Sequence, residues 1–197
     1  MDKNILSVIL SSLIFLITFI ILGYLFYFYK KRKSVLEKLA LTLPGKISPS
    51  FFQPSFNGQY QGLGFSITLI PSSENSPTYL NISLFKNSFF KLRIYKESIL
   101  SNVGKKLGII HEVKTYDEAF DKEFLIFSNN SSLAFSYLNK NEIRNTIKEI
   151  FNLGFTIFLI DDKKIFIQKP NYNLLTDLEP NFIINLLEKL SFLARGL

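Results

Sequence analysis

The sequence predicts an α+β protein, with an N-terminal transmembrane helix followed by a mainly antiparallel sheet whose helices pack on one face. Three observations carry this prediction. Residues 5–29 form an uncharged apolar run, and residues 60–95 and 155–167 alternate apolar with polar side chains as strands do. Apolar residues also recur at helical spacing in 143–151 and 183–193. The order of strands, helices, a hairpin and a last helix is typical of this class.

The first element is a predicted membrane anchor with a basic flank, residues 1–33. The run from Ile5 to Tyr29 holds 25 residues without a charge, and at about 1.5 Å per residue it exceeds the roughly 30 Å of a bilayer core. Tyr24, Tyr27 and Tyr29 lie at its C-terminal end, and aromatic rings favour the headgroup region of a membrane. A cleaved signal peptide would be shorter and would end at small residues, so we expect the anchor to be retained.

A basic block predicts the orientation of this anchor. Lys30, Lys31, Arg32 and Lys33 follow the apolar run directly, whereas residues 34–197 hold 18 basic and 15 acidic residues, a net of +3 out of +7. Basic residues favour the cytoplasmic side of a membrane. We therefore expect a single-pass protein of the inner (plasma) membrane, with its N-terminus outside and its C-terminal domain in the cytoplasm. The block could also bind anionic headgroups, and the small remaining charge argues against a nucleic-acid partner.

The next segment, 34–57, is a predicted juxtamembrane helix and linker. Apolar residues at helical spacing favour a helix over 34–43, and Pro44-Gly45 ends it. Prolines, an asparagine and serines between Lys46 and Gly58 favour a linker. The cytosolic α+β domain is then expected over 58–197.

Strands dominate the first part of the domain. Residues 60–70, 78–85 and 89–95 read as three antiparallel strands in sequence, and the short Lys86-Asn87-Ser88 link predicts a hairpin between the last two. Residues 107–113 and 124–127 predict two further short strands.

Helices and a hairpin complete the domain. The turn 128–132 can cap a short helix, and Ile143, Ile147, Ile150 and Phe151 form the stripe of a longer one that ends before Gly154. Residues 155–160 and 164–167 flank Asp161-Asp162 as a hairpin. A last amphipathic helix begins near Pro180, with its apolar stripe at Ile183, Leu186, Leu187, Leu190 and Leu193.

The composition removes much of the usual catalytic and metal-binding repertoire. The 197 residues include no Cys and one His, and 47% of them are hydrophobic. Disulfides, thiolate nucleophiles and Cys-containing zinc sites are therefore excluded, as are sites that need two imidazoles. We expect no cofactor and no metal, and a non-enzymatic protein is favoured.

The catalytic candidates are Asp117, Asp121 and His111. On a helix the two carboxylates would share a face, and paired carboxylates can perform acid–base chemistry or bind a hard cation. However, Phe120 and Phe124 alternate with them, which favours a capped, half-buried turn over a site. His111 would need a nucleophile and an orienting partner in space to act as a base.

The acidic segment also carries a resemblance. Residues 116–127 read Tyr-Asp-Glu-Ala-Phe-Asp-Lys-Glu-Phe-Leu-Ile-Phe, followed by Ser-Asn-Asn. This resembles a D-x-x-F-D-x-x-F-x-V motif of uncharacterised bacterial membrane-anchored proteins, although Tyr116 replaces the usual Gly and the strand ends in Phe127. The resemblance covers roughly residues 58–197. It implies a single-pass protein with a cytosolic α+β domain, and it implies no activity.

The leading functional interpretation is a membrane-tethered cytosolic module that binds a membrane or cytosolic protein, or assembles at the inner membrane. One alternative is a membrane-proximal enzyme that uses Asp117, Asp121 and His111. The other is an anionic-lipid sensor that uses Lys30, Lys31, Arg32 and Lys33.

Overall fold

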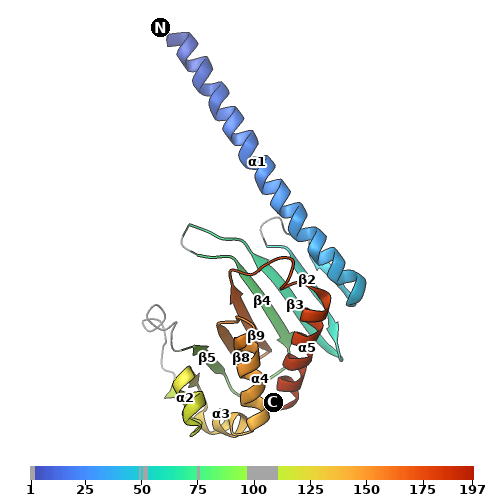
Figure 1. The fold of residues 1–197 in the computed structure, drawn as a ribbon, viewed down its shortest axis with the longest axis vertical. Helices are drawn as coiled ribbons and strands as arrows, with labels where there is room; N and C mark the ends of the chain where they lie inside the picture. The colour runs from blue at the N-terminus through green and yellow to red at the C-terminus, as the bar shows by residue number, and fades with distance from the viewer. Residues whose placement is uncertain (1–2, 49, 51–52, 75, 97–110) are drawn as a thin grey trace.

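A computed structural model describes residues 3–48, 50, 53–74, 76–96 and 111–197, with the side chains of 3–10 and of His111 outside that description (Figure 1). Its first element is one long helix, α1 (Lys3–Thr42), which extends far beyond the rest of the molecule. The predicted helix over 34–43 is the last part of α1, which ends at Thr42, two residues before Pro44.

The described residues form a single nine-stranded sheet in which every neighbouring pair is antiparallel. Its spatial order is β1-β2-β3-β4-β9-β8-β5-β7-β6. The strands are β1 (Gly45–Ser48), β2 (Ser55–Tyr60), β3 (Leu63–Ile70), β4 (Tyr79–Phe85), β5 (Leu92–Lys96), β6 (His111–Glu112), β7 (Phe124–Ser128), β8 (Ile157–Asp161) and β9 (Lys164–Pro170).

Strand alternation places the core on one face of this sheet. One row of cross-strand neighbours runs unbroken over seven strands, and all of its side chains are buried: Phe56, Ile67, Ile82, Ile167, Phe158, Ile94 and Ile126. The intervening residues of these strands point to the opposite face and stay largely half-exposed. The predicted α+β class, a mainly antiparallel sheet with helices on one face, is confirmed.

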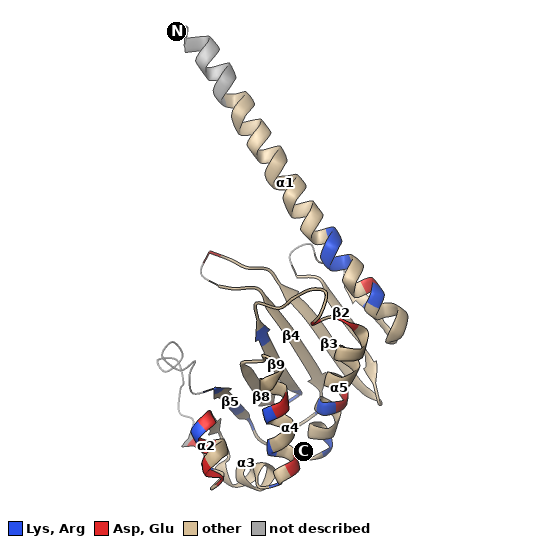
Figure 2. Cartoon of the chain, in the orientation of Figure 1, with Lys and Arg blue, Asp and Glu red and all other residues tan. Residues whose placement is uncertain are grey.

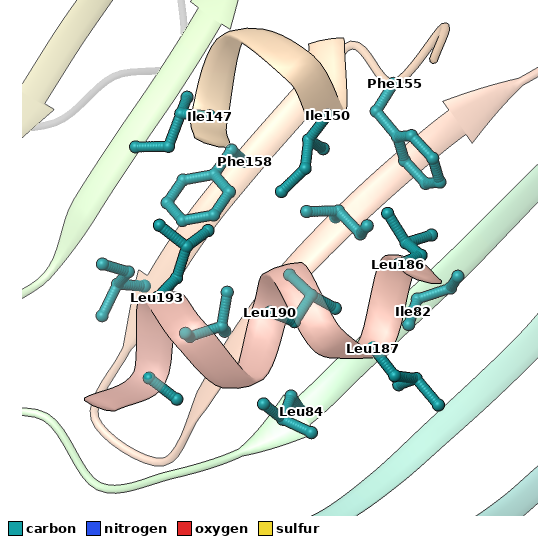
Figure 3. Packing of buried hydrophobic residues seen from close by; sticks show 14 of the residues in the cluster. Ile82, Leu84, Ile147, Ile150, Phe155, Phe158, Leu186, Leu187, Leu190 and Leu193 are labelled. Carbon is teal, nitrogen blue, oxygen red and sulfur yellow. The ribbon is translucent and has the colours of Figure 1, made fainter. Parts of the chain in front are cut away.

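The helices that cover this face are α2 (Glu118–Glu123), α3 (Ser131–Leu138), α4 (Asn141–Asn152) and α5 (Pro180–Arg195). In Figure 3, Leu186, Leu187 and Leu190 of α5 point toward Ile82 and Leu84 of β4, while Ile147 and Ile150 of α4 approach Phe158 of β8. The residues of the predicted apolar stripes of both helices are therefore buried in the core. Gly154 follows α4 at φ 91°, a conformation that glycine adopts without strain.

The expected linker is the first difference from the sequence-based prediction. Two strands, β1 and β2, lie within it. β1 pairs with β2 and β2 pairs with β3, so the sheet begins at Gly45. Proline, asparagine and glycine disfavour strands locally, and only Phe56 of β2 is buried. The pairing with β3 and the contact between the Phe56 and Phe65 rings, 5.7 Å between centroids, outweigh these local preferences.

The expected hairpin between 78–85 and 89–95 is wrong. β4 pairs with β9 and β5 pairs with β8, so the predicted and confirmed β8–β9 hairpin lies between them. The connecting residues cross the end of that hairpin, where the Lys86 amide donates to the Lys163 carbonyl at 3.0 Å and the Ser88 amide to the Asp162 carbonyl at 3.1 Å. The predicted strand 107–113 falls mostly outside the described residues, and its described part is β6 with Val113.

Candidate functional sites

The junction between α1 and the domain is the first candidate site. Within the part of the chain that the structure describes, one helix is long and apolar enough to cross a membrane, and none of its apolar stretch is buried in the protein. Figure 2 shows this stretch without charged residues until the basic block. Three and six residues after the end of this block, Leu36 and Leu39 are fully buried in the core, where α1 contacts the first two strands and α5. The same helix is therefore an exposed apolar rod at one end and a core helix at the other.

The structure divides the basic block into two pairs. Lys30 and Lys31 are exposed. Arg32 is half-buried and its charge acts on the Tyr172 hydroxyl, and the Lys33 ammonium lies 3.7 Å from the Glu37 carboxylate one turn later. Burial raises the pKa of Tyr172, and the Arg32 charge opposes that effect. Only half of the block is thus presented outward for a lipid headgroup.

Tyr172 belongs to a segment, 171–178, that an ion pair between Lys169 and Asp177 holds against the sheet. The Lys169 ammonium donates to the Asp177 carboxylate at 2.8 Å and to the Leu153 carbonyl at 2.7 Å. Asp177 in turn accepts from the Asn173 amide at 2.8 Å, while its own amide donates to the Asn173 carbonyl at 2.9 Å. The Lys169–Asp177 pair was not predicted from the sequence. The signal was present, because the β9 alternation puts Lys169 on the same face as the buried Ile165 and Ile167, where a charge needs a partner.

The acidic segment around α2 is the second candidate site. Asp117 caps α2 by accepting from the Phe120 amide at 3.1 Å, and the Arg144 Nε of α4 lies 3.1 Å from its other oxygen. The Phe120 amide, followed by the Lys148 and Arg144 charges, holds the pKa of Asp117 below its ordinary value. The carboxylate therefore joins α2 to α4.

Asp121 is held by the residues just before the helix. Its oxygens accept from the Thr115 amide at 3.0 Å, the Thr115 hydroxyl at 2.8 Å and the Tyr116 amide at 3.2 Å. The structure thus brings Asp117 and Asp121 into one capping network around α2. His111 lies in β6 with Ser128 as its cross-strand partner, but its side chain lies outside the described residues. The catalytic grouping of the three residues stays a prediction.

The third candidate is a groove along α4 and α5. Two shallow cavities of about 350 and 400 Å³ share Phe192 and Arg195 of α5. Thr146, Glu188, Lys189 and Gln61 line the first, and Lys140, Glu142, Ile143 and Gly196 line the second. An aromatic ring beside an arginine, rimmed by charges of both signs, is a surface suited to binding a protein. The described residues contain no group of three or more Asp, Glu or His side chains placed to hold a metal ion.

Comparisons with known proteins add a fold likeness. No protein-family model matches the chain, and no curated protein matches it. The chain is similar in structure to the mycobacterial trehalose monomycolate transport factor A, TtfA, known from a crystal structure. The TM-score is 0.52 at 11% sequence identity, and the match covers 85% of this chain and 90% of that one. At this identity the likeness shows a shared α+β fold over most of both chains.

Proposed function

We propose that this protein is a non-enzymatic, membrane-tethered module of the inner membrane, whose cytoplasmic domain binds a partner protein or assembles at the bilayer surface. The observation that carries the proposal is the continuity of α1, which runs from its exposed apolar stretch into the core as one helix of 40 residues. A domain joined in this way stays close to the membrane and keeps a fixed orientation relative to α1, because no flexible linker lies between the span and Leu36.

The polar side chains of the acidic segment also favour a module over an enzyme. The Asp117 carboxylate accepts hydrogen bonds from the Phe120 amide and from Arg144. The Asp121 carboxylate accepts from the amide and the side-chain hydroxyl of Thr115. Such carboxylates stabilise a turn, whereas a general base must be available to a substrate. The protein with the similar fold is named as a transport factor, and that name states no catalytic activity.

The partner surface we favour is the α4–α5 groove. It can be tested by placing a photo-crosslinking amino acid at Thr146 or Phe192 of the full-length protein in its native membrane. Glu118 on α2 is a matched control position, since its side chain is 88% exposed and lies on another helix. We expect one discrete adduct from the two groove positions and none from Glu118.

Two other outcomes contradict different parts of the proposal. An adduct formed in equal yield at Glu118 would contradict the role of the groove as the partner surface. A protein that is reproducibly a partner-free monomer in mild detergent, with no adduct at any position, would contradict the interaction function itself.

A second candidate function, an anionic-lipid sensor, is favoured by the exposure of Lys30 and Lys31. Each exposed basic residue near an anionic surface contributes about 1 kcal/mol to membrane attraction. Replacing both by glutamine should then abolish a preference for anionic vesicles while the topology stays the same. If the topology inverts instead, the block is an orientation signal.

A further inference from the structure

A leucine stands at the apex of a tightly held turn after β9. Leu175 is 68% exposed, whereas Leu174 beside it packs against the core. The turn is closed by the Asn173–Asp177 hydrogen bonds and by the Leu175 amide, which donates to the Asn173 side chain at 2.9 Å. The Lys169–Asp177 ion pair anchors the turn to the sheet. The fold therefore holds a large apolar side chain outward on a rigid support.

This turn lies at the end of the domain that meets the span. Arg32, which contacts Tyr172, is three residues beyond Tyr29, so it lies only about 4.5 Å along the helix axis from the end of the apolar run. Figure 1 shows the segment between β9 and α5 beside the lower part of α1. A helix that places Arg32 at the headgroups therefore brings Tyr172, and Leu175 three residues later, to the same level.

The exposed acidic and basic side chains at this end nearly balance. The apex itself reads Asn-Leu-Leu-Thr and carries no charge. Glu74 in the β3–β4 loop and Glu179 at the start of α5 are exposed acids, and Lys30 and Lys31 are the exposed bases of the junction. A membrane contact made here would be driven by apolar burial, with little net attraction to anionic lipid.

We propose that the Leu175 turn inserts into the interfacial region of the bilayer that α1 crosses, as a second contact between this domain and its own membrane. This inference rests on the proposed function, because it requires α1 to span. Two contacts, the helix and the turn, fix the rotation of the domain about α1 as well as its height, which one helix alone does not. Tyr172 belongs to both contacts, since it interacts with Arg32 of α1 and lies three residues before Leu175.

The chain contains no cysteine, so single cysteines can report each position without background labelling. We would introduce Leu175→Cys, Thr176→Cys, Ile20→Cys and Phe89→Cys separately into the full-length protein and attach an environment-sensitive nitrobenzoxadiazole dye. Phe89 is the matched control, because its ring is 90% exposed at the opposite end of the sheet. Ile20 reports the span. Vesicles of phosphatidylcholine, with or without phosphatidylglycerol, would carry spin-labelled lipids that quench at the headgroup or deep in the acyl region.

We expect the Leu175 dye to shift its emission to the blue and to lose several-fold more intensity to the headgroup quencher than the Phe89 dye. The loss should be alike in both lipid mixtures and smaller at Thr176. The Ile20 dye should be quenched by the deep label. Tyr172→Phe, which removes only the hydroxyl that Arg32 contacts, should weaken the quenching at Leu175 and leave that at Ile20 unchanged.

Three other outcomes of this experiment would each contradict a different part of the inference. If Ile20 is quenched and Leu175 behaves like Phe89, the turn stays in water and the inference is overturned while the span stands. If Ile20 is not quenched, the span and the proposed function fail together. If Leu175 is quenched only with phosphatidylglycerol, charge attraction draws the domain to the bilayer and apolar insertion is overturned.

Discussion

At the scale of single residues, the hydrogen bonds of Asp117 and Asp121 determine what these carboxylates do. The sequence singles out the acidic segment, and the alternating Phe120 and Phe124 already favour a capped turn over a site. The structure agrees, because both rings are buried and stack at 4.8 Å between centroids. Which amides each carboxylate accepts depends on the backbone path before α2, where Tyr116 adopts φ 61°. No spacing in the sequence specifies that path.

The Asp121→Ala substitution should destabilise the protein by about 1–3 kcal/mol, because it leaves the buried Thr115 amide and hydroxyl without their acceptor. Urea unfolding of the full-length protein in detergent, followed by near-ultraviolet circular dichroism, measures the change. Glu118→Ala is the control, since its ion pair with Lys122 is on the surface and should contribute less than about 1 kcal/mol. Equal losses for the two variants would contradict this role of Asp121.

Asp117 should make the stability depend on pH in the acid range. Its pKa is lower in the folded protein than in the unfolded chain, so its ionised form favours folding. The advantage of wild type over Asp117→Asn should therefore be complete at neutral pH and shrink as the pH falls below about 4, through the lowered folded pKa. Unfolding curves of both proteins at several pH values test this. A difference that grows on acidification would have the wrong sign.

At the scale of elements, two leucines of α1 show what periodicity resolves and what it leaves open. Leu39 and Leu41 stand two residues apart, and helical spacing assigns Leu39 to the buried stripe with Val35, Leu36 and Leu43. The structure has Leu39 fully buried and Leu41 88% exposed. What the stripe packs against was not predictable, because β1 becomes a strand by pairing with β2, and β2 by pairing with β1 and β3.

Replacing Leu39 by alanine should cost about 2–5 kcal/mol of unfolding free energy, since a fully buried side chain leaves a cavity. Leu41→Ala, the same chemical change two residues away, should stay within about 0.5 kcal/mol. Urea unfolding in detergent compares the two. Similar costs would mean that the end of α1 does not pack on the domain.

Gly58 should be intolerant of a side chain because of the close approach of β1, β2 and β3. A Cβ there would lie 2.3 Å from the Pro44 carbonyl oxygen and 2.7 Å from the Phe65 ring. Gly58→Ala should therefore destabilise by about 1–3 kcal/mol or more. Gly64→Ala is the control, because its Cβ would come no closer than 3.2 Å to any atom beyond its chain neighbours, the nearest being Cδ2 of the exposed Phe85 ring, and the change should cost less than the Gly58 substitution. Thermal unfolding ranks the two variants.

At the scale of the whole molecule, several neighbouring strands of the sheet lie far apart in the chain. The β8–β9 hairpin enters between β4 and β5, which precede it by about seventy residues. The link 86–91 is long enough to cross two strands, at about 4.8 Å per strand spacing and 3.3 Å per residue. A short polar link is equally compatible with a hairpin, so local reasoning chose the wrong neighbour.

The topology of the full protein should be N-terminus outside and domain inside. A single cysteine introduced at Phe89, which is 90% exposed, should stay unlabelled by an impermeant maleimide in intact cells and become labelled after permeabilisation. Replacing Lys30, Lys31, Arg32 and Lys33 with neutral residues should raise labelling in intact cells, since the positive-inside signal is lost. Full labelling of the unaltered block in intact cells would place the domain outside.

The sequence by itself determined the apolar span, the basic block, the α+β class and the buried stripes of α4 and α5. Each of these depends on composition or on periodicity within one segment. The strand order, the two strands in the expected linker and the proximity of Arg32 to Tyr172 could be known only from the folded protein. These depend on which distant segments meet, and a pairing gains its hydrogen bonds and burial only once both partners are in place. The same holds for the Leu175 turn, whose place near the span follows from contacts 140 residues apart in the chain (172 − 32).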